Sequence, residues 1–339
     1  MVKIMVYIVK RKIMFTIITV ILICTCLVGV SAAILGETVK TVAQSNYIKW
    51  VDFDIPYTIL KQALKYDIES FGSDIKLNWI ELLAYAAARG GGKFAGGKPS
   101  TSINNMVKRL KKGESVAEIT RDVKYYSFYY EAYTAILGEY VGEYAAEADD
   151  PDNPGQTKLI TKYGLKVFSP IAKGYSYSHS DDFGNSRSYG YRRVHLGNDL
   201  FGLTGTPVIA VEGGVIEALG WNRYGGWRIG IRSHDRKRYY YYAHLRKGHP
   251  FVKTLKTGDT VKAGDVIGYL GRTGYSTKED TNNLTASHLH FGVQLIFDES
   301  QKEGVNQIWI NLYDIVKLLS SNRSAVVKDQ ENKDYHRVR

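Results

Sequence analysis

The residues best suited to chemistry stand near the end of the chain, in the stretch SHLHFGVQLIF from Ser287 to Phe297. Apolar residues occupy every second position from the first leucine onward, which is typical of a β-strand with one buried face. His288 and His290 therefore share the other face, about 6 to 7 Å apart. That spacing is too long for a hydrogen bond between the rings but suits two side chains lining one cleft. Taken alone, the pattern fits two solvated histidines equally well.

Further histidines and a carboxylate precede this strand in a glycine-rich part of the chain. The stretch RVHLGNDLFG places His195 and Asp199 four residues apart, and YYYYAHL carries His244. On an extended backbone, residues i and i+4 share a face, so His195 and Asp199 can converge on one metal ion. A histidine from another strand would complete an open site of two histidines and one aspartate. Each residue alone also has a structural explanation, as a turn residue, a surface histidine or a buried hydrogen-bonded side chain.

Alternation along the tyrosine-rich stretch predicts which of its side chains face the cleft. Tyr240, Tyr242 and His244 are expected on one face of the strand. The other face would carry Tyr239, Tyr241 and Ala243. If His244 faces the cleft, Tyr242 lies beside it, either as a substrate contact or as a packing residue.

In this order, H-x-x-x-D, an aromatic-A-H-L and S-H-L-H-F resemble the lysostaphin and LytM type of zinc endopeptidase. The resemblance covers roughly Phe168 to Phe297 and includes GDTVKAGDVIG and GRTG. It implies an all-β domain of the LytM kind, with a duplicated hybrid motif. It also implies hydrolysis of peptide bonds in bacterial peptidoglycan, in the cross-bridge or the stem peptide, through a metal-activated water.

The resemblance further implies a role for each motif position. It assigns Zn²⁺ to three ligands, which are His195, Asp199 and His290. It makes His244 and His288 the catalytic pair, one accepting a proton from the attacking water and the other stabilising the oxyanion or protonating the leaving amine. Domains of this kind also serve as non-catalytic scaffolds that bind cell wall or a protein partner. Because all five positions are present, the sequence favours the enzyme.

The segment from Ile13 to Leu35 contains no charged residue and follows Lys10, Arg11 and Lys12. It is close to the ~20 residues that span a bilayer and exceeds the apolar core of about 7 to 15 residues in a signal peptide. We therefore expect a single-pass anchor in the cell membrane, with the catalytic domain outside the cytoplasm. Alternatively, the small residues Val30–Ala32 mark a cleavage site and the protein is secreted.

Composition narrows the partners and the metal ligands. A chain of 339 residues with 44% hydrophobic residues allows about two packed domains. The net charge of +11 suggests an anionic partner. Because no nucleic-acid-binding motif accompanies the charge, we expect no nucleic-acid partner. Both cysteines, Cys24 and Cys26, lie in the apolar segment. The rest of the chain therefore forms no disulfide, and a metal site there must use histidine and carboxylate ligands.

Changes in sequence texture predict the domain organisation. Leucine, isoleucine and alanine at helical spacing give way to AEADDPDNPGQT and then to short alternating segments. The expected parts are a cytoplasmic N-terminus with its anchor or signal segment (1–36), a small α-helical domain (37–145), a linker (146–157), a β metallopeptidase domain that folds alone (158–321) and a polar tail (322–339). The role of the helical domain and any protein partner stay open, and a glycan-cleaving role for it would rest only on Glu81.

Overall fold

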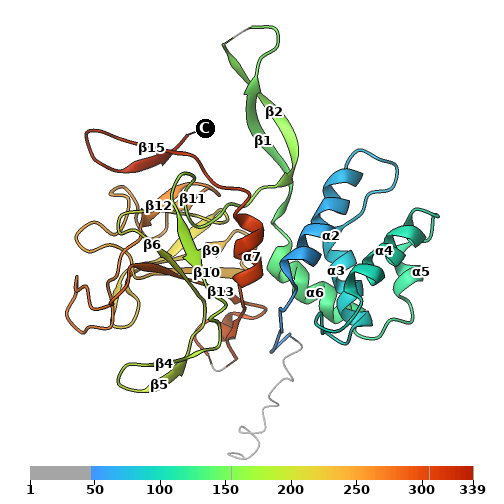
Figure 1. Cartoon of the computed structure of the whole chain (residues 1–339), viewed down its shortest axis with the longest axis horizontal. Helices are drawn as coiled ribbons and strands as arrows, with labels where there is room; N and C mark the ends of the chain where they lie inside the picture. Colours follow the sequence, from blue (N-terminus) through green and yellow to red (C-terminus); the bar gives the residue numbers. More distant parts are fainter. Residues whose placement is uncertain (1–46, 154, 305, 339) are drawn as a thin grey trace, which may run out of the picture. The chain divides into compact units, whose positions relative to one another are not determined.

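The computed structural model describes residues 47–339 except 154, 305 and 339 (Figure 1). Residues Ile48–Arg339 form one compact unit. The expected membrane segment, Ile13 to Leu35, lies outside the described residues, as does the whole of the predicted 1–36 part. Among the helices that are described, none is both long enough and apolar enough to cross a membrane.

The helical region predicted before the β-domain is present. Asn78 starts one helix by accepting hydrogen bonds from the backbone amides of Ile80 (2.8 Å) and Glu81 (3.3 Å). Ser115 and Glu118 start another with a reciprocal capping box. In chain order the helices are α2 (Tyr57–Ser70), α3 (Trp79–Arg89), α4 (Pro99–Leu110), α5 (Val116–Thr120) and α6 (Tyr126–Leu137).

A β-hairpin follows the helices and contains the whole segment expected to be a linker, 146–157. Strands β1 (Val141–Asp149) and β2 (Thr157–Leu165) pair antiparallel along their full length. Only the Pro- and Gly-containing residues between Asp149 and Thr157 form the turn. The structure differs from the expectation of a linker because the backbone N–H and C=O groups of this polar segment are hydrogen-bonded to the opposite strand. Local composition does not show that such a strand is present.

The rest of the chain is mostly β-structure, as predicted, and is built on an eight-stranded antiparallel sheet. Its strand order is β11-β8-β9-β10-β13-β6-β3, with β14 paired to β13. Its strands are β3 (Tyr177–His179), β6 (Asn198–Gly202), β8 (Gly214–Asn222), β9 (Gly226–Ser233), β10 (Arg238–Ala243), β11 (Thr260–Val261), β13 (His288–Leu295) and β14 (Ile308–Trp309). Smaller elements surround it: β4 (Ser186–Ser188), β5 (Arg192–Val194), β7 (Pro207–Ile209), β12 (Val266–Tyr269), η1 (Glu299–Gln301) and α7 (Tyr313–Leu319).

One face of the central strands is buried and the other faces a cleft. The alternation predicted from Leu289 to Leu295 is confirmed, since these apolar residues have at most 1% of their surface exposed. Tyr240 and Tyr242 of β10 pack on Phe291 of β13 from the same side. The opposite face of β10 and β13 is therefore free to carry polar side chains.

A buried ion pair ties the helical region to the sheet. Arg238, which has no exposed surface, donates two hydrogen bonds to the Glu212 carboxylate (2.8 and 3.1 Å). It also donates to the carbonyl of Ala135 near the end of α6, and Tyr240 donates to Glu212 (2.6 Å). Apolar residues of the helices and of the sheet belong to one continuous core. These contacts join residues about a hundred positions apart, and the expectation that the β-domain folds alone stays a prediction.

The C-terminal residues expected to be a loose tail form a packed hairpin of β15 (Val326–Lys328) and β16 (Tyr335–Arg337). Asp334 is buried beside it and accepts hydrogen bonds from the Tyr269 hydroxyl (2.9 Å) and the Lys253 amide (3.0 Å). His249 lies 2.7 Å from the same carboxylate. Polar composition was misleading here because hydrogen bonds to distant residues hold this segment, together with the packing of Val326 and Tyr335 on a small apolar cluster.

Candidate metal centre and active site

Two neighbouring strands and one loop bring the predicted ligands together. In the register of β6 with β13, Asp199 lies directly opposite His290. His195 enters from the loop between β5 and β6, and Gly197 in that loop passes close to the histidine ring. A Cβ atom at Gly197 would lie 2.7 Å from Cε1 of His290, so only glycine fits without displacing the ring.

The three candidate ligand atoms surround one point. Nε2 of His195 lies 3.0 Å from Oδ1 of Asp199 and 2.8 Å from Nδ1 of His290, and the last two atoms are 3.3 Å apart. Ligands about 2.0 to 2.1 Å from a tetrahedral ion are separated by about 3.3 Å, so the spacing fits a small divalent metal. These residues form a group able to hold a metal ion, as the sequence predicted.

Asp182 and Arg187 support this group and were not identified from the sequence. The carbonyl oxygen of Asp182 lies 3.0 Å from Nδ1 of His195, which places the proton on Nδ1 and leaves the Nε2 lone pair facing the metal position. Arg187 donates to the carboxylates of Asp182 (2.9 Å) and Asp199 (3.2 Å). No spacing in the sequence links these residues to the ligands, because both come from loops and short strands outside the motif.

The charge states at the site follow from this packing. Burial alone would raise the pKa of Asp199, but its close contacts with the imidazoles of His195 and His290 and the neighbouring His288 lower it well below the usual range. Burial lowers the pKa of His290, which opposes protonation of the ring. An ionised carboxylate and neutral imidazoles are the forms that bind metal.

The two predicted catalytic histidines lie beside the ligand group, held by backbone carbonyls. Nδ1 of His244 lies 2.8 Å from the carbonyl oxygen of Thr273, and Nδ1 of His288 lies 3.0 Å from that of Ala286. Their ring centroids are 4.9 Å apart. Because a carbonyl only accepts, each Nδ1 carries the proton and each Nε2 is left as a proton acceptor. Burial and the two neighbouring histidines lower the pKa of His244 well below its ordinary value.

The structure corrects the prediction for Tyr242. This side chain is fully buried, and its hydroxyl accepts a hydrogen bond from the Val211 amide (3.0 Å), so it packs in the core and does not reach substrate. Alternation failed because His244 follows the end of β10 with φ of 62°, a left-handed conformation that turns its ring to the opposite face. The cleft therefore receives His244 together with Tyr239 and Tyr241.

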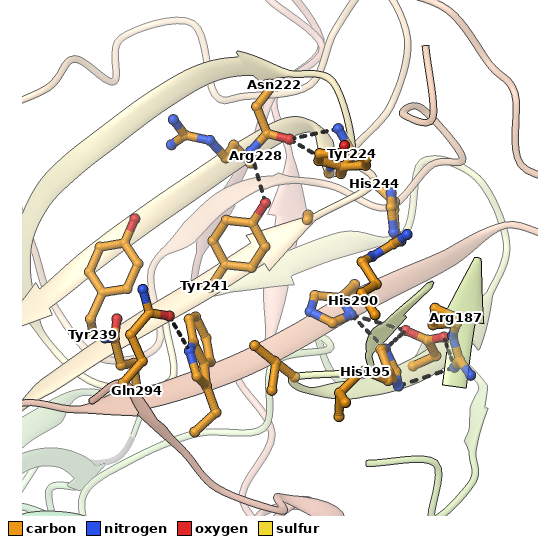
Figure 2. Close-up of a pocket in the computed structure, with 18 of the residues that line it drawn as sticks. Arg187, His195, Asn222, Tyr224, Arg228, Tyr239, Tyr241, His244, His290 and Gln294 are labelled. Carbon is orange, nitrogen blue, oxygen red and sulfur yellow. Dashed lines mark hydrogen bonds and ion pairs between the residues drawn. The ribbon is translucent and has the colours of Figure 1, made fainter. Parts of the chain in front are cut away.

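The histidines lie in a cleft of about 610 Å³ whose floor is formed by β9, β10 and β13. Figure 2 shows His195, His290 and Arg187 close together, with Tyr241 and Tyr239 farther along the floor. Tyr241 packs edge-on against His290, with centroids 5.8 Å apart, and its hydroxyl accepts from Asn222 (3.1 Å). Glu81 lies on α3 and does not line this cleft.

Comparison with known proteins assigns this part of the chain to a family. Residues 193–306 match the model of peptidase family M23. The chain carries an M23 peptidase domain. The sequence-based assignment is thereby confirmed, and the matched range contains all five predicted metal and catalytic residues.

Relatives of the M23 domain include endopeptidases, among them a peptidoglycan DD-endopeptidase of Vibrio cholerae that is 34% identical over 102 residues, 30% of this chain and 20% of that protein. An L-Ala–D-Glu endopeptidase of Bacillus subtilis is 44% identical over 124 residues, which are 37% of this chain and 36% of that protein. Lysostaphin of Staphylococcus simulans is 43% identical over 99 residues, 29% of this chain and 17% of that protein. The chain therefore spans about a third or less of the length of these relatives.

A solved structure extends the likeness beyond the M23 domain. A crystal structure from Ruminococcus gnavus, described as a candidate glycyl-glycine endopeptidase LytM, is 26% identical, with a TM-score of 0.51. The match covers 83% of this chain and 93% of that one. This share is more than residues 141–339 alone can supply, so the similarity continues into the helical region.

Proposed function

We propose that this protein is a zinc-dependent endopeptidase that hydrolyses peptide bonds in bacterial peptidoglycan. The observation that carries the proposal is the convergence of three metal-ligating side chains at a cleft, with two further histidines beside them. The M23 match and the peptidoglycan endopeptidases among its relatives support the reaction class. The bond cut stays open between stem peptide and cross-bridge, since the relatives differ in this respect.

The donor set fits zinc. His195, Asp199 and His290 would hold the ion, because two imidazoles and one carboxylate are common ligands of catalytic zinc. A bound zinc ion would supply Lewis acidity, polarising a peptide carbonyl and lowering the pKa of water. Asp182 keeps the His195 ring in the tautomer that offers Nε2 to the metal.

His244 and His288 would move the protons. With Nδ1 of each ring bonded to a carbonyl, the lone pair of each Nε2 is free to accept a proton from water. Once protonated, the same ring can donate to the leaving amine or to the developing oxyanion. The fixed carbonyl contacts hold both rings, so little reorientation is needed during the reaction.

A non-catalytic scaffold is the alternative function, and a defined digestion separates the two. The full chain, loaded with zinc, would be incubated with peptidoglycan of known composition, and the released fragments would be identified by mass. We expect new peptide termini that disappear after chelation and return when zinc is added. A zinc-loaded protein that releases no fragment, alongside an active control hydrolase, would favour the scaffold.

We also propose that the catalytic domain lies outside the cytoplasm. Either Ile13 to Leu35 anchors it in the membrane, or cleavage in this segment releases it. The support is the uncharged segment and the basic residues that precede it. Protease would be added outside wall-stripped cells, and the membrane fraction would then be tested for the M23 domain. We expect the domain to be digested. Protection of the domain while an external control protein is digested would contradict this topology, and a soluble form starting near Ala33 would indicate cleavage.

A further inference from the structure

The cleft contains one cationic side chain that has no acceptor. Four cationic residues line it, and three of them have at least one acceptor: Arg187 at Asp182 and Asp199, Arg193 at the Tyr275 hydroxyl, and Lys302 at Glu217. Arg193 uses only Nη2 for this bond, and its Nη1 is buried without a partner among the described residues. The guanidinium of Arg228, on strand β9, makes no hydrogen bond or ion pair within the part of the chain that the structure describes. A guanidinium presents up to five donors in a planar fork, which matches a carboxylate.

Arg228 is placed where a bound peptide can reach it. It lies on β9 in the cleft floor and is half-buried. Figure 2 shows it on the side of Tyr241 away from the ligand group. Two acidic residues line the cleft, and neither neutralises it: Asp199 belongs to the ligand group, and Glu303 is exposed and forms no ion pair with Arg228. The cleft therefore keeps the positive charge of Arg228 without an ion-pair partner among the described residues, on the far side of Tyr241 from the ligand group.

A second donor lies next to Arg228. The hydroxyl of Tyr239 sits directly over Gly230, because a Cβ atom there would lie 1.9 Å from it. Gly230 is two residues from Arg228 on the same strand, so both face the cleft on the same side of the sheet. The Tyr239 hydroxyl has no hydrogen-bond partner among the described residues. Burial raises the pKa of Tyr239 to about 12, so this hydroxyl stays protonated and can donate.

We propose that Arg228 and the Tyr239 hydroxyl bind a free carboxylate of the peptide substrate, so that the cleft selects acidic peptides over neutral ones. This inference rests on the proposed function and names the substrate class of the same site. The half-buried guanidinium and the hydroxyl both lack acceptors, so a carboxylate would give them charge-assisted hydrogen bonds. A carboxamide carries no charge and would give them only weaker hydrogen bonds.

Binding by the full chain, with metal removed by a chelator so that nothing is cut, tests the inference directly. The probes are L-alanyl-γ-D-glutamyl-L-lysine and its analogue in which the free α-carboxylate of the glutamyl residue is a carboxamide. They differ by one charge at one position. We expect calorimetry to show the carboxylate peptide binding about ten- to a hundredfold more tightly, the range of a charged hydrogen bond.

Substitutions assign this preference to the two donors. Arg228→Gln should remove the preference, Tyr239→Phe should reduce it, and Arg228→Lys should keep part of it, because the charge remains but the planar fork is lost. Arg192→Gln is the matched control. Arg192 is exposed, bonds to Ser186 and does not line the cleft, so this variant should keep the full preference.

The outcomes separate this inference from the proposed function. Equal affinity for the two peptides, no measurable binding of the carboxylate peptide, or a preference retained in Arg228→Gln would each overturn the carboxylate site. A separate digestion by the zinc-loaded full chain tests catalysis. Peptidoglycan cleavage without a charge preference would leave the enzyme standing and remove the subsite, whereas a charge preference without cleavage would keep the subsite and remove the enzyme.

Discussion

At the scale of single residues, the five histidine and aspartate positions differ in what their free atoms face. The ligand atoms of three residues point at one another: His195, Asp199 and His290. Bringing these acceptor atoms together raises the free energy of the folded state unless a cation or protons lie between them. His244 and His288 are bonded to main-chain carbonyls at Nδ1 and face the cleft with Nε2. The first group is therefore arranged for a metal and the second for proton transfer.

The first prediction follows from the ligand group. Replacing His195, Asp199 or His290 with alanine should reduce zinc occupancy strongly, since two protein ligands bind zinc poorly. Metal content of the purified variants, compared with wild type by elemental analysis, checks this. A ligand variant that keeps one zinc per chain would remove that residue from the site.

The second prediction concerns the catalytic pair. His244→Ala and His288→Ala should lower peptide hydrolysis by about two to four orders of magnitude, because they remove proton transfer and oxyanion stabilisation. Zinc content should stay at the wild-type level. If either variant loses its zinc along with its activity, the residue is a ligand and its assigned role is wrong.

At the scale of elements, close approach between a loop and a strand fixes the metal position. At Gly197 the loop before β6 passes close to the ring of His290 on β13. A side chain at position 197 would occupy the space that this ring now fills. The neighbouring strands supply a rigid floor, and their register sets Asp199 opposite His290. Small backbone shifts here would therefore change metal affinity before they change the fold.

The third prediction tests this contact. Gly197→Ala should lower zinc affinity by displacing His290, because the new Cβ would lie 2.7 Å from both the ring and the Phe291 carbonyl. Gly142→Ala is the control, since its Cβ would meet only the flexible end of Lys166 at 3.5 Å. Zinc titration with a competing chelator measures both variants. Wild-type affinity in Gly197→Ala would show that the loop can move without cost.

At the scale of the whole molecule, the helical region is part of the structure that holds the M23 domain. The buried Arg238 carries its charge between Glu212, Asp235 and a helix carbonyl, and apolar residues from both regions form one core. Removing the helices would leave that charge short of an acceptor and expose the apolar surface. Helices and sheet are therefore expected to unfold together.

The fourth prediction measures this coupling. Glu212→Gln should lower the free energy of unfolding by about 3 kcal/mol or more, because it breaks a buried pair and leaves Arg238 undercompensated. Glu69→Gln, which removes an exposed ion pair with Lys65, should cost less than about 0.5 kcal/mol. Chemical denaturation followed by circular dichroism and by tryptophan fluorescence checks both. Two separate transitions in the wild type would show that the helices and the sheet are not coupled.

The sequence by itself determined the local periodicity and the order of the motifs. Alternation from Leu289 to Leu295 placed His288 and His290 on the face opposite the core, because successive side chains of a strand point in opposite directions. The order of His195, Asp199, His244 and the H-x-H pair was enough to identify the family and the residues that can hold a metal. These features depend on near neighbours in the chain.

Only the tertiary structure decided what depends on distant residues. The left-handed turn at His244 directs its ring to the face opposite Tyr242, which stays in the core with Tyr240 and bonds to Val211. Asp182 reaches His195 from a separate loop, and Arg238 finds its partners across about a hundred residues. A buried polar group must be paired wherever its partner lies in the sequence. The pairing is therefore set when distant segments pack, and no local pattern records it.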